Sequence, residues 1–278
     1  MSDAPTAGSI REALAGASDA LAATGVETPR LDTELLLGEA TGWDRARLAA
    51  ESETGVPADA GRKFAAMVRR RLRREPVAYI LGRKGFRSIE LEVDRRVLIP
   101  RPETELLVEL ALELRPRRVL DIGTGSGALA LAIADELPGC EAIATDTSPA
   151  ALEVACANAE RLGLADRVEF VEAMLPPDPG ELDLIVANLP YVAERDWAGL
   201  EPEVTQWEPR EALLAGQDGL DVLRTVIPAV ASAAPALALE VGAGQAPAVS
   251  ELLFAAGFAT VEARPDLAGI PRVVWGRQ

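Results

Sequence analysis

Residues 119–146 read VLDIGTGSGALALAIADELPGCEAIATD, and this stretch decides the fold. A short apolar strand, residues 119–122, runs into a glycine-rich turn that opens a helix over residues 128–136. A second apolar strand, residues 142–145, ends at Asp146. A strand, a helix and a parallel strand form a βαβ unit, and ligands of such sheets bind at the carboxyl ends of the strands. The sequence therefore predicts an α/β protein with a ligand site at this turn.

The same alternation continues toward higher residue numbers. We expect further strands at residues 168–171, 182–187 and 236–241, and helices at residues 149–162, 220–231 and 247–256. The last two strands, residues 259–263 and 272–275, are joined by a short loop with no crossover helix, so they should be antiparallel. A mainly parallel sheet with one reversed strand at its end differs from a plain dinucleotide-binding fold.

Residues before the sheet are expected to be helical. Ser9-Ile10-Arg11-Glu12 fits a capping box that opens a first helix, and Thr28-Pro29 opens a second. A third helix is expected after Pro57, ending at Glu75-Pro76. Residues 85–93 then alternate apolar and polar, as in a half-buried strand whose partner would be residues 97–99, before a helix over residues 103–114.

Composition limits the classes of protein. The chain has 278 residues, is 49% hydrophobic and has a mean hydropathy of +0.11, which is ample for a core. No apolar stretch reaches membrane-spanning length, and Met1-Ser2-Asp3 lacks the basic start of a secretory signal. Cys140 and Cys156 form no metal or disulfide pattern. We expect a reduced, cytoplasmic protein that does not bind membranes.

Two features of the charged residues restrict the chemistry. The chain has no histidine, which excludes His-based catalytic triads and His-ligated metals, and we expect no metal site. The net charge of −16 opposes binding to nucleic acid. Basic residues nevertheless gather between Arg62 and Arg101. They could bind an acidic or RNA-bearing partner. We prefer the interpretation that most of them lie on a solvated helix face and on a hairpin edge, where Lys and Arg discourage pairing with another strand.

Asn188-Leu189-Pro190-Tyr191 follows the expected strand at residues 182–187 directly. The Asn188 amide therefore lies where a ligand of an α/β sheet is expected. Pro190 favours an extended Leu189, which fixes the direction of the Leu189 carbonyl. That carbonyl and the Asn188 side-chain oxygen could hold a planar –NH2 group by both hydrogens. Taken alone, the tetrapeptide fits a simple strand-ending turn equally well.

The glycine turn by itself leaves the nucleotide open. Gly123, Gly125 and Ala128 satisfy the dinucleotide fingerprint loosely, and Asp146 lies where a ribose partner would. Gly127 follows Gly125 by two residues rather than three, which favours a wider turn around an amino-acid-bearing nucleoside. NAD and S-adenosyl-L-methionine both remain possible from this motif alone.

Several motifs in order make the chain resemble one family. They are Leu98-Ile99-Pro100-Arg101-Pro102-Glu103-Thr104-Glu105, the glycine turn, Asn188-Leu189-Pro190-Tyr191, Trp207-Glu208-Pro209-Arg210-Glu211-Ala212-Leu213 and Gly219-Leu220-Asp221. The chain resembles the HemK/PrmC family of peptide chain release factor N(5)-glutamine methyltransferases over essentially its whole length. That family transfers a methyl group from S-adenosyl-L-methionine to the side-chain amide nitrogen of the glutamine in the Gly-Gly-Gln (GGQ) motif, leaving S-adenosyl-L-homocysteine.

The resemblance implies a domain organisation. It predicts a helical substrate-recognition domain at residues 1–82, a β-hairpin linker at 83–101 and a class I methyltransferase domain at 102–278. The methyltransferase domain would be Rossmann-like, with a seven-stranded, mostly parallel sheet. Its partners would be release factors, with neither DNA nor membrane among them.

The resemblance also assigns roles to individual positions. Catalysis would fall to Asn188, and substrate binding to Asn188, Leu189, Pro190 and Tyr191. The cofactor would contact Gly123, Thr124, Gly125, Ser126, Gly127, Asp146, Met174 and Asn188, with the adenine near Ala173 and Met174. Two positions depart from the family: Leu189 replaces a usual proline, and an acidic residue common near Ala173 is missing.

Other functions and roles stay open at this point. A DNA adenine N6-methyltransferase uses a similar Asn-x-Pro-Tyr segment, but the acidic chain lacks a DNA-reading domain. A NAD-binding oxidoreductase would need a hydride-transfer acid that is not evident. Arg101, Glu103 and Glu105 could orient the substrate or merely support a helix start. Trp207-Glu208-Pro209 could cover the pocket or pack structurally, and packing is favoured for Trp207.

Overall fold

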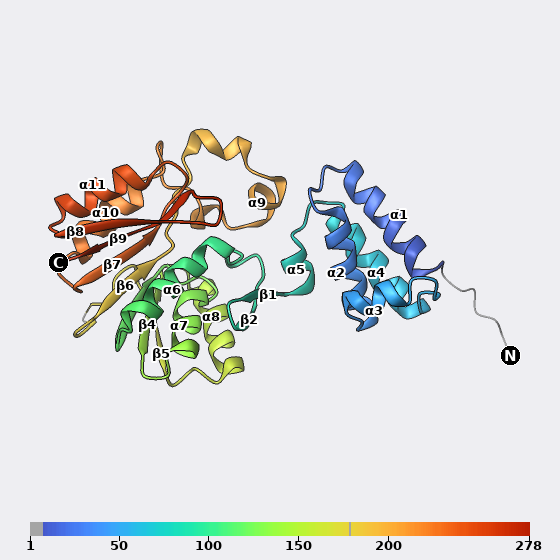
Figure 1. Cartoon of the computed structure of the whole chain (residues 1–278), viewed down its shortest axis with the longest axis horizontal. Coiled ribbons are helices and arrows are strands. Elements are labelled where there is room, and N and C mark those ends of the chain that lie inside the picture. The colour runs from blue at the N-terminus through green and yellow to red at the C-terminus, as the bar shows by residue number, and fades with distance from the viewer. Residues whose placement is uncertain (1–7, 178) are drawn as a thin grey trace. The chain divides into compact units, whose positions relative to one another are not determined.

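A computed structural model of the chain describes residues 8–177 and 179–278. It divides into two compact units, the first ending at Gly82 and the second spanning Arg83–Gln278. Figure 1 shows the course of the chain through both units. Each unit is described by itself below.

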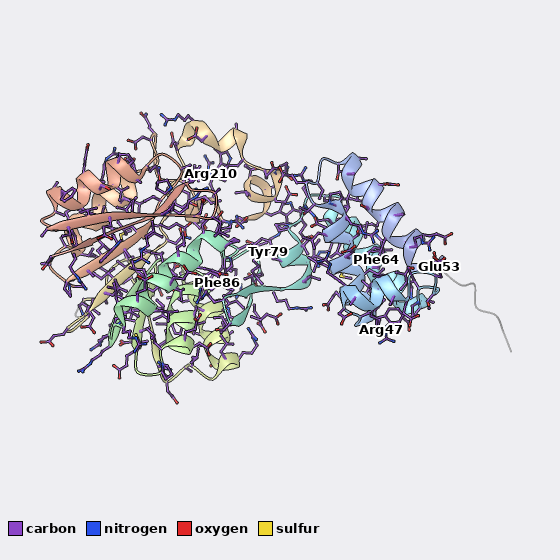
Figure 2. The ribbon with its side chains drawn as sticks, viewed as in Figure 1. Arg47, Glu53, Phe64, Tyr79, Phe86 and Arg210 are labelled. Atoms are coloured by element: carbon purple, nitrogen blue, oxygen red, sulfur yellow. The ribbon has the colours of Figure 1, made fainter. Side chains whose placement is uncertain are left out.

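The first unit consists of helices. They are α1 (Ile10–Ala23), α2 (Pro29–Thr41), α3 (Arg45–Ala50), α4 (Ala58–Arg71) and α5 (Val77–Leu81). The predicted capping box is confirmed: Ser9 Oγ accepts the Glu12 N–H while the Glu12 carboxylate accepts the Ser9 N–H. Ile10, Leu36 and Phe64 share one apolar core, in which Figure 2 labels Phe64 among the helices.

The third predicted helix is shorter than expected. Helix α4 stops at Arg71, and the chain then passes through Arg74 with a positive φ of 63° before α5 begins. Pro76 explains the break because proline cannot continue a helix from the residues before it. A buried ion pair between Arg71 Nε and Asp32 Oδ2, 2.7 Å apart, joins α4 to α2.

The hairpin differs from its prediction. Residues 85–93 do not form one strand: β1 (Arg83–Phe86) pairs antiparallel with β2 (Ile89–Glu92), and residues 97–99 lie outside any strand. The prediction of a single strand was wrong because the chain turns at Arg87 and Ser88. Phe86 and Ile89, on either side of this turn, are both buried, as they would be in one continuous strand. Arg87 adopts φ 52° there, and its guanidinium is held by Glu136. Phe86, labelled in Figure 2, is almost fully buried.

The second unit contains a seven-stranded sheet. Its strands are β3 (Arg118–Ile122), β4 (Glu141–Asp146), β5 (Val168–Glu172), β6 (Leu184–Ala187), β7 (Ala236–Glu240), β8 (Thr260–Pro265) and β9 (Pro271–Arg277). They lie in the order β5-β4-β3-β6-β7-β9-β8. The antiparallel pairing of the last two strands is confirmed, and β9 also pairs antiparallel with β7. The sequence did not indicate that β9 lies inside the sheet.

Helices cover both faces of the sheet. Figure 1 shows α6 (Glu105–Leu114), α7 (Ala128–Glu136) and α8 (Pro149–Leu162) on one face, and α10 (Asp221–Val230) and α11 (Ala246–Ala255) on the other. Strands β6 and β7 are buried at every residue, as expected for parallel strands covered on both sides. The predicted Ser148 cap and Gly163 stop of α8 are confirmed, with Gly163 at φ 71°.

The helix predicted over residues 103–114 begins as the short element η1 (Pro102–Thr104) and continues as α6. Three short elements between β6 and α10 were not predicted: η2 (Glu194–Gly199), α9 (Pro202–Trp207) and η3 (Arg210–Ala212). Strand order reverses around β3, because β4 follows on one side of it and β6 lies on the other. Such a switch point opens a crevice at the carboxyl ends of the strands, and the site lies there.

Candidate active site

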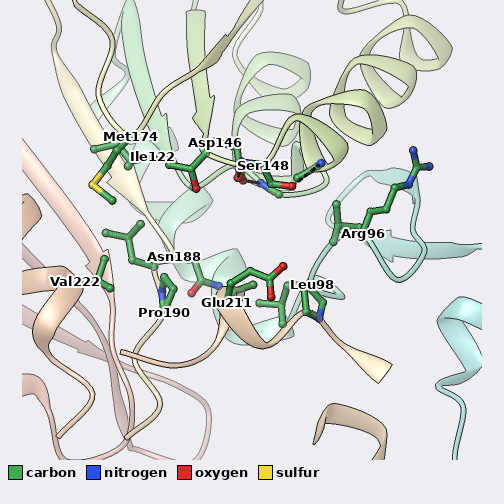
Figure 3. Close-up of a pocket in the computed structure, with 18 of the residues that line it drawn as sticks. Arg96, Leu98, Ile122, Asp146, Ser148, Met174, Asn188, Pro190, Glu211 and Val222 are labelled. Carbon is green, nitrogen blue, oxygen red and sulfur yellow. Dashed lines mark hydrogen bonds between the residues drawn. The ribbon is translucent and has the colours of Figure 1, made fainter. Parts of the chain in front are cut away.

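A cavity of about 230 Å³ opens at the carboxyl ends of β3, β4 and β6. Figure 3 shows Asp146 and Ser148 on one wall and Asn188 and Pro190 across from them. The cavity gathers most residues that the sequence pointed to, namely Gly123, Gly125, Asp146, Ala173, Met174, Asn188, Leu189 and Pro190. Thr124, Ser126, Gly127 and Tyr191 are not among the residues that line it.

The glycine turn brings bare backbone to the cavity. Gly123, Gly125 and Gly127 have φ values of 74°, 57° and 84°, a region that side chains rarely adopt. A Cβ on Gly123 would also lie 3.1 Å from Leu189 Cδ2, so this glycine lets the Asn188–Pro190 segment approach. Thr124 and Ser126 are buried behind the turn, and Thr124 Oγ1 donates to Asp121 at 2.7 Å.

Asp146 is held by backbone donors on both oxygens. Its Oδ2 accepts the Gly125 N–H and its Oδ1 accepts the Ser148 N–H, each at 2.9 Å. The carboxylate therefore fixes the glycine turn and is fixed by it. Each oxygen keeps lone-pair capacity for a ligand hydroxyl in the cavity.

Asp121 is a buried acid that the sequence analysis left without a role. Its Oδ2 accepts from Thr124 Oγ1 and from the Ala130 N–H, while Oδ1 has no hydrogen-bond partner among the described residues. Burial, together with the nearby charge of Asp146, raises the pKa of Asp121 to about 7. The signal was present in the sequence, because an acid inside an apolar strand is unusual.

Asn188 ends a chain of buried hydrogen bonds. Its Nδ2 donates to Thr104 Oγ1 at 3.0 Å, and Thr104 Oγ1 donates to Glu240 Oε2 at 2.6 Å. Tyr191 Oη donates to the other carboxylate oxygen, Oε1, at 3.2 Å. Tyr191 thus packs behind the cavity wall rather than on it. Gln245 fixes the same segment, because its Nε2 donates to the Tyr191 carbonyl at 2.9 Å.

Glu240 and Thr104 were missed as site residues. Glu240 is 1% exposed at the end of β7, and burial raises its pKa to about 7. Burial and the Glu240 charge likewise raise the pKa of Tyr191. An acid at the end of the apolar run 236–241 was the available signal, but only the fold reveals that Thr104 meets it.

Glu208 connects the segment before η1 to the segment after α9. Its carboxylate accepts from Arg101 Nη2 at 2.5 Å and from the Ile99 N–H at 3.1 Å. The Arg95 guanidinium stacks 4.0 Å from the centre of the Trp207 ring. These contacts support the packing interpretation of Trp207, and they place Arg101 beside Glu208 rather than on the cavity wall.

The described residues contain neither a metal-binding cluster nor a helix able to span a membrane. No group of three or more His, Cys, Asp or Glu side chains that could hold a metal ion occurs in the part of the chain that the structure describes. Over residues 8–177 and 179–278, no helix is both long enough and apolar enough to cross a membrane.

Family models match both units of the chain. The PrmC N-terminal domain matches residues 12–82, and a methyltransferase domain matches residues 119–207. In fold, the chain is similar to the hMettl16 catalytic domain, with a TM-score of 0.57 and 18% identity over 67% of this chain and 75% of that one. These findings confirm the class I methyltransferase fold and imply S-adenosyl-L-methionine as the methyl donor.

Relatives of known name match the chain almost from end to end. A release factor glutamine methyltransferase of Cereibacter sphaeroides is 43% identical over 96% of this chain and 97% of that protein. One from Geobacter sulfurreducens is 40% identical over 100% of this chain and 99% of its own length. The chain therefore belongs to the family of release factor glutamine methyltransferases.

Proposed function

We propose that this enzyme transfers the methyl group of S-adenosyl-L-methionine to the side-chain amide nitrogen of the glutamine in the GGQ motif of peptide chain release factors. One observation carries the proposal: Asn188 and Asp146 line a single cavity, the first suited to an amide and the second to a ribose. The names of the relatives give the substrate class. Because release factors act in translation, we place the enzyme in the cytoplasm.

The residues of the cavity fit the methyl donor. Asp146 offers fixed carboxylate oxygens to the ribose hydroxyls, and Gly123 and Gly125 let backbone approach the amino-acid part. Met174 and Ala173 supply an apolar contact for the adenine. Thr124, Ser126 and Gly127 do not line the cavity, but they hold the glycine turn in the conformation that does. When bound, the donor supplies an electrophilic methyl group on a sulfonium.

Asn188 would activate the substrate by orientation. An amide nitrogen is a poor nucleophile because its lone pair is delocalised into the carbonyl. The Asn188 oxygen and the Leu189 carbonyl accept both N–H hydrogens, aim the nitrogen and stabilise positive charge that develops on it. With the donor bound, its methyl carbon would pass to this nitrogen with loss of the C–S bond, which would leave S-adenosyl-L-homocysteine, and the proton released by the methylated amide would pass to solvent.

Pro190 and Tyr191, the two other predicted substrate contacts, help to hold Asn188 and the Leu189 carbonyl in place. Pro190 lines the cavity beside Asn188, and Tyr191 anchors the segment through Glu240 and Gln245. No histidine is needed for this reaction, which depends on positioning rather than on a general base.

We propose that the helical part, residues 1–82, recognises the release factor, with residues 83–101 as a linker and residues 102–278 as the catalytic domain. The match of the PrmC N-terminal domain to residues 12–82 supports the first boundary. A net charge of −16 argues against DNA as a partner. The adenine-methyltransferase and oxidoreductase alternatives are not favoured by the relatives.

The test is methyl transfer from labelled S-adenosyl-L-methionine to a purified release factor. Its GGQ→GGA variant and duplex DNA are run beside it. We expect label on the intact factor alone, and label on DNA would replace the proposal with the adenine enzyme. Asn188→Ala should lower kcat by about 100-fold or more, since one preorganised group is removed. Gln206→Ala, which removes an exposed amide on α9, is the matched control and should leave kcat unchanged.

A further inference from the structure

The orientation of the Asn188 amide is decisive for the proposed function. Only its oxygen can accept an N–H of the substrate, whereas its –NH2 group would meet the substrate –NH2 donor to donor. The amide can present either end to the cavity by turning about its last side-chain bond. Something in the protein must therefore set which end faces the substrate.

The buried chain behind Asn188 supplies this selection. An ionised carboxylate only accepts hydrogen bonds, so both hydroxyls that meet Glu240 must donate to it. The Thr104 hydroxyl donates its single proton to Glu240 Oε2, 2.6 Å away. It can therefore only accept a hydrogen bond from Asn188. The group that faces Thr104 at 3.0 Å is accordingly Nδ2, which leaves Oδ1 for the cavity.

We propose that Glu240 is a positioning residue that, through the Thr104 hydroxyl, fixes the Asn188 oxygen toward the substrate amide. The inference rests on the proposed function and names the residues that keep its active site competent. Neither residue touches the reacting atoms, and both are buried, with Glu240 1% and Thr104 3% exposed. Buried hydrogen-bond chains of this kind hold one arrangement because a reversed member would leave an unpaired polar group.

Protonation of Glu240 would reverse the chain. A protonated Oε2 donates to Thr104, the Thr104 proton then turns to Asn188, and the amide presents Nδ2 to the cavity. The Tyr191 hydroxyl keeps its proton in both states, because its pKa is raised, and it can therefore go on donating to Oε1 while the Glu240 proton occupies Oε2. The ionised form of Glu240 is therefore the active one.

The ionisation of Glu240 falls within an accessible pH range. Burial raises its pKa to about 7, opposed by the hydrogen bonds from Thr104 and Tyr191. Charges reach it from neighbouring elements: Glu103 of η1 raises the pKa further, and Arg272 of β9 lowers it. We expect kcat to rise with pH through about 7 and to level off above it.

The first experiment observes the amide directly and needs no methyl acceptor. The chain has two asparagines, Asn158 and Asn188, so the full-length protein labelled with ¹⁵N-asparagine gives two side-chain amide pairs. Asn188→Ala assigns them by removing one pair. We expect the Asn188 pair to shift with pH with a midpoint near 7, and the shift to vanish in Glu240→Gln. An Asn188 pair that has the same chemical shifts in Glu240→Gln as in the wild type at pH 8.5 overturns the proposal.

The second experiment measures kcat, KM for the release factor and the Kd of S-adenosyl-L-homocysteine. Thr104→Val, of the same shape without the hydroxyl, should lower kcat by about 10- to 100-fold, the scale of a misplaced reacting group. The Kd should stay unchanged, and Thr104→Ser should restore kcat. A Thr104→Ser as slow as Thr104→Val, or a Thr104→Val as fast as wild type, contradicts the role. Failure of the wild type to methylate any release factor would instead refute the proposed function, while the amide spectrum would still report on Glu240.

Discussion

Replacing Asp146 by Ala should weaken binding of S-adenosyl-L-homocysteine strongly. Each Asp146 oxygen already accepts one backbone N–H, from Gly125 or Ser148, and each keeps capacity for about one ribose hydroxyl. A hydrogen bond to a charged group contributes about 1.5–3 kcal/mol, and the two are not fully additive. We therefore expect a loss of about 3 kcal/mol, which is roughly a 100- to 200-fold higher Kd.

Isothermal titration calorimetry at pH 7.5 measures this Kd, with circular dichroism as the check on folding. Glu172→Ala is the matched control, because Glu172 lies opposite Asp146 in the β4–β5 register but is exposed and away from the cavity. Its Kd should equal that of the wild type. A folded Asp146→Ala protein whose Kd stays within about threefold of the wild type, well below the expected change, would refute the ribose assignment.

Three further outcomes test the fold around the site. The folded pKa of Asp121 is raised from 3.8 to about 7, so the unfolded state loses this proton first and stability falls as pH rises between those values, by up to about 4 kcal/mol. Urea unfolding from pH 4.5 to 8 should therefore show a shallower decline for Asp121→Asn, and an equal decline would contradict the assignment. Gly219→Ala would place a Cβ 2.2 Å from the Tyr191 carbonyl oxygen at φ 79°, so unfolding should show a loss of at least about 2 kcal/mol and kcat should fall. Gly139→Ala, where a Cβ meets nothing within 4 Å, should change neither quantity. Glu208→Gln should lower the free energy of unfolding by about 2 kcal/mol. The loss is smaller than for a fully buried ion pair because the partner, Arg101, is 30% exposed. An unchanged melting temperature would contradict a stabilising role for this ion pair.

Elements marked by local signals were predictable from the sequence. The Ser9 capping box and the Ser148 cap act over three residues, so their helices begin where expected. The cavity residues Asp146 and Asn188 were also placed correctly at strand ends, because parallel strands bring their carboxyl ends together. Their roles in binding and catalysis remain predictions.

Features that depend on distant partners were not predictable. Thr104 and Glu240 are 136 residues apart, and no local pattern links a hydroxyl before one helix to an acid at the end of a buried strand. The hairpin was mistaken for one strand because apolar residues continue on both sides of the turn, although the alternation breaks there: Phe86 and Ile89 are three residues apart. The pattern of apolar residues therefore predicted which side chains are buried, but it did not predict that the chain reverses direction between β1 and β2.

The interior position of β9 has a consequence for how the protein forms during synthesis. Strand β7 is hydrogen-bonded to β6 on one side and to β9 on the other, yet β9 is the last of the sheet strands along the chain. Glu240 itself lies opposite Val273. Until residues 271–277 have left the ribosome, β7 has an open edge beside Glu240. A nascent chain that has not yet added β9 would therefore contain every strand whose end lines the cavity, while Glu240 still lacked its neighbour Val273.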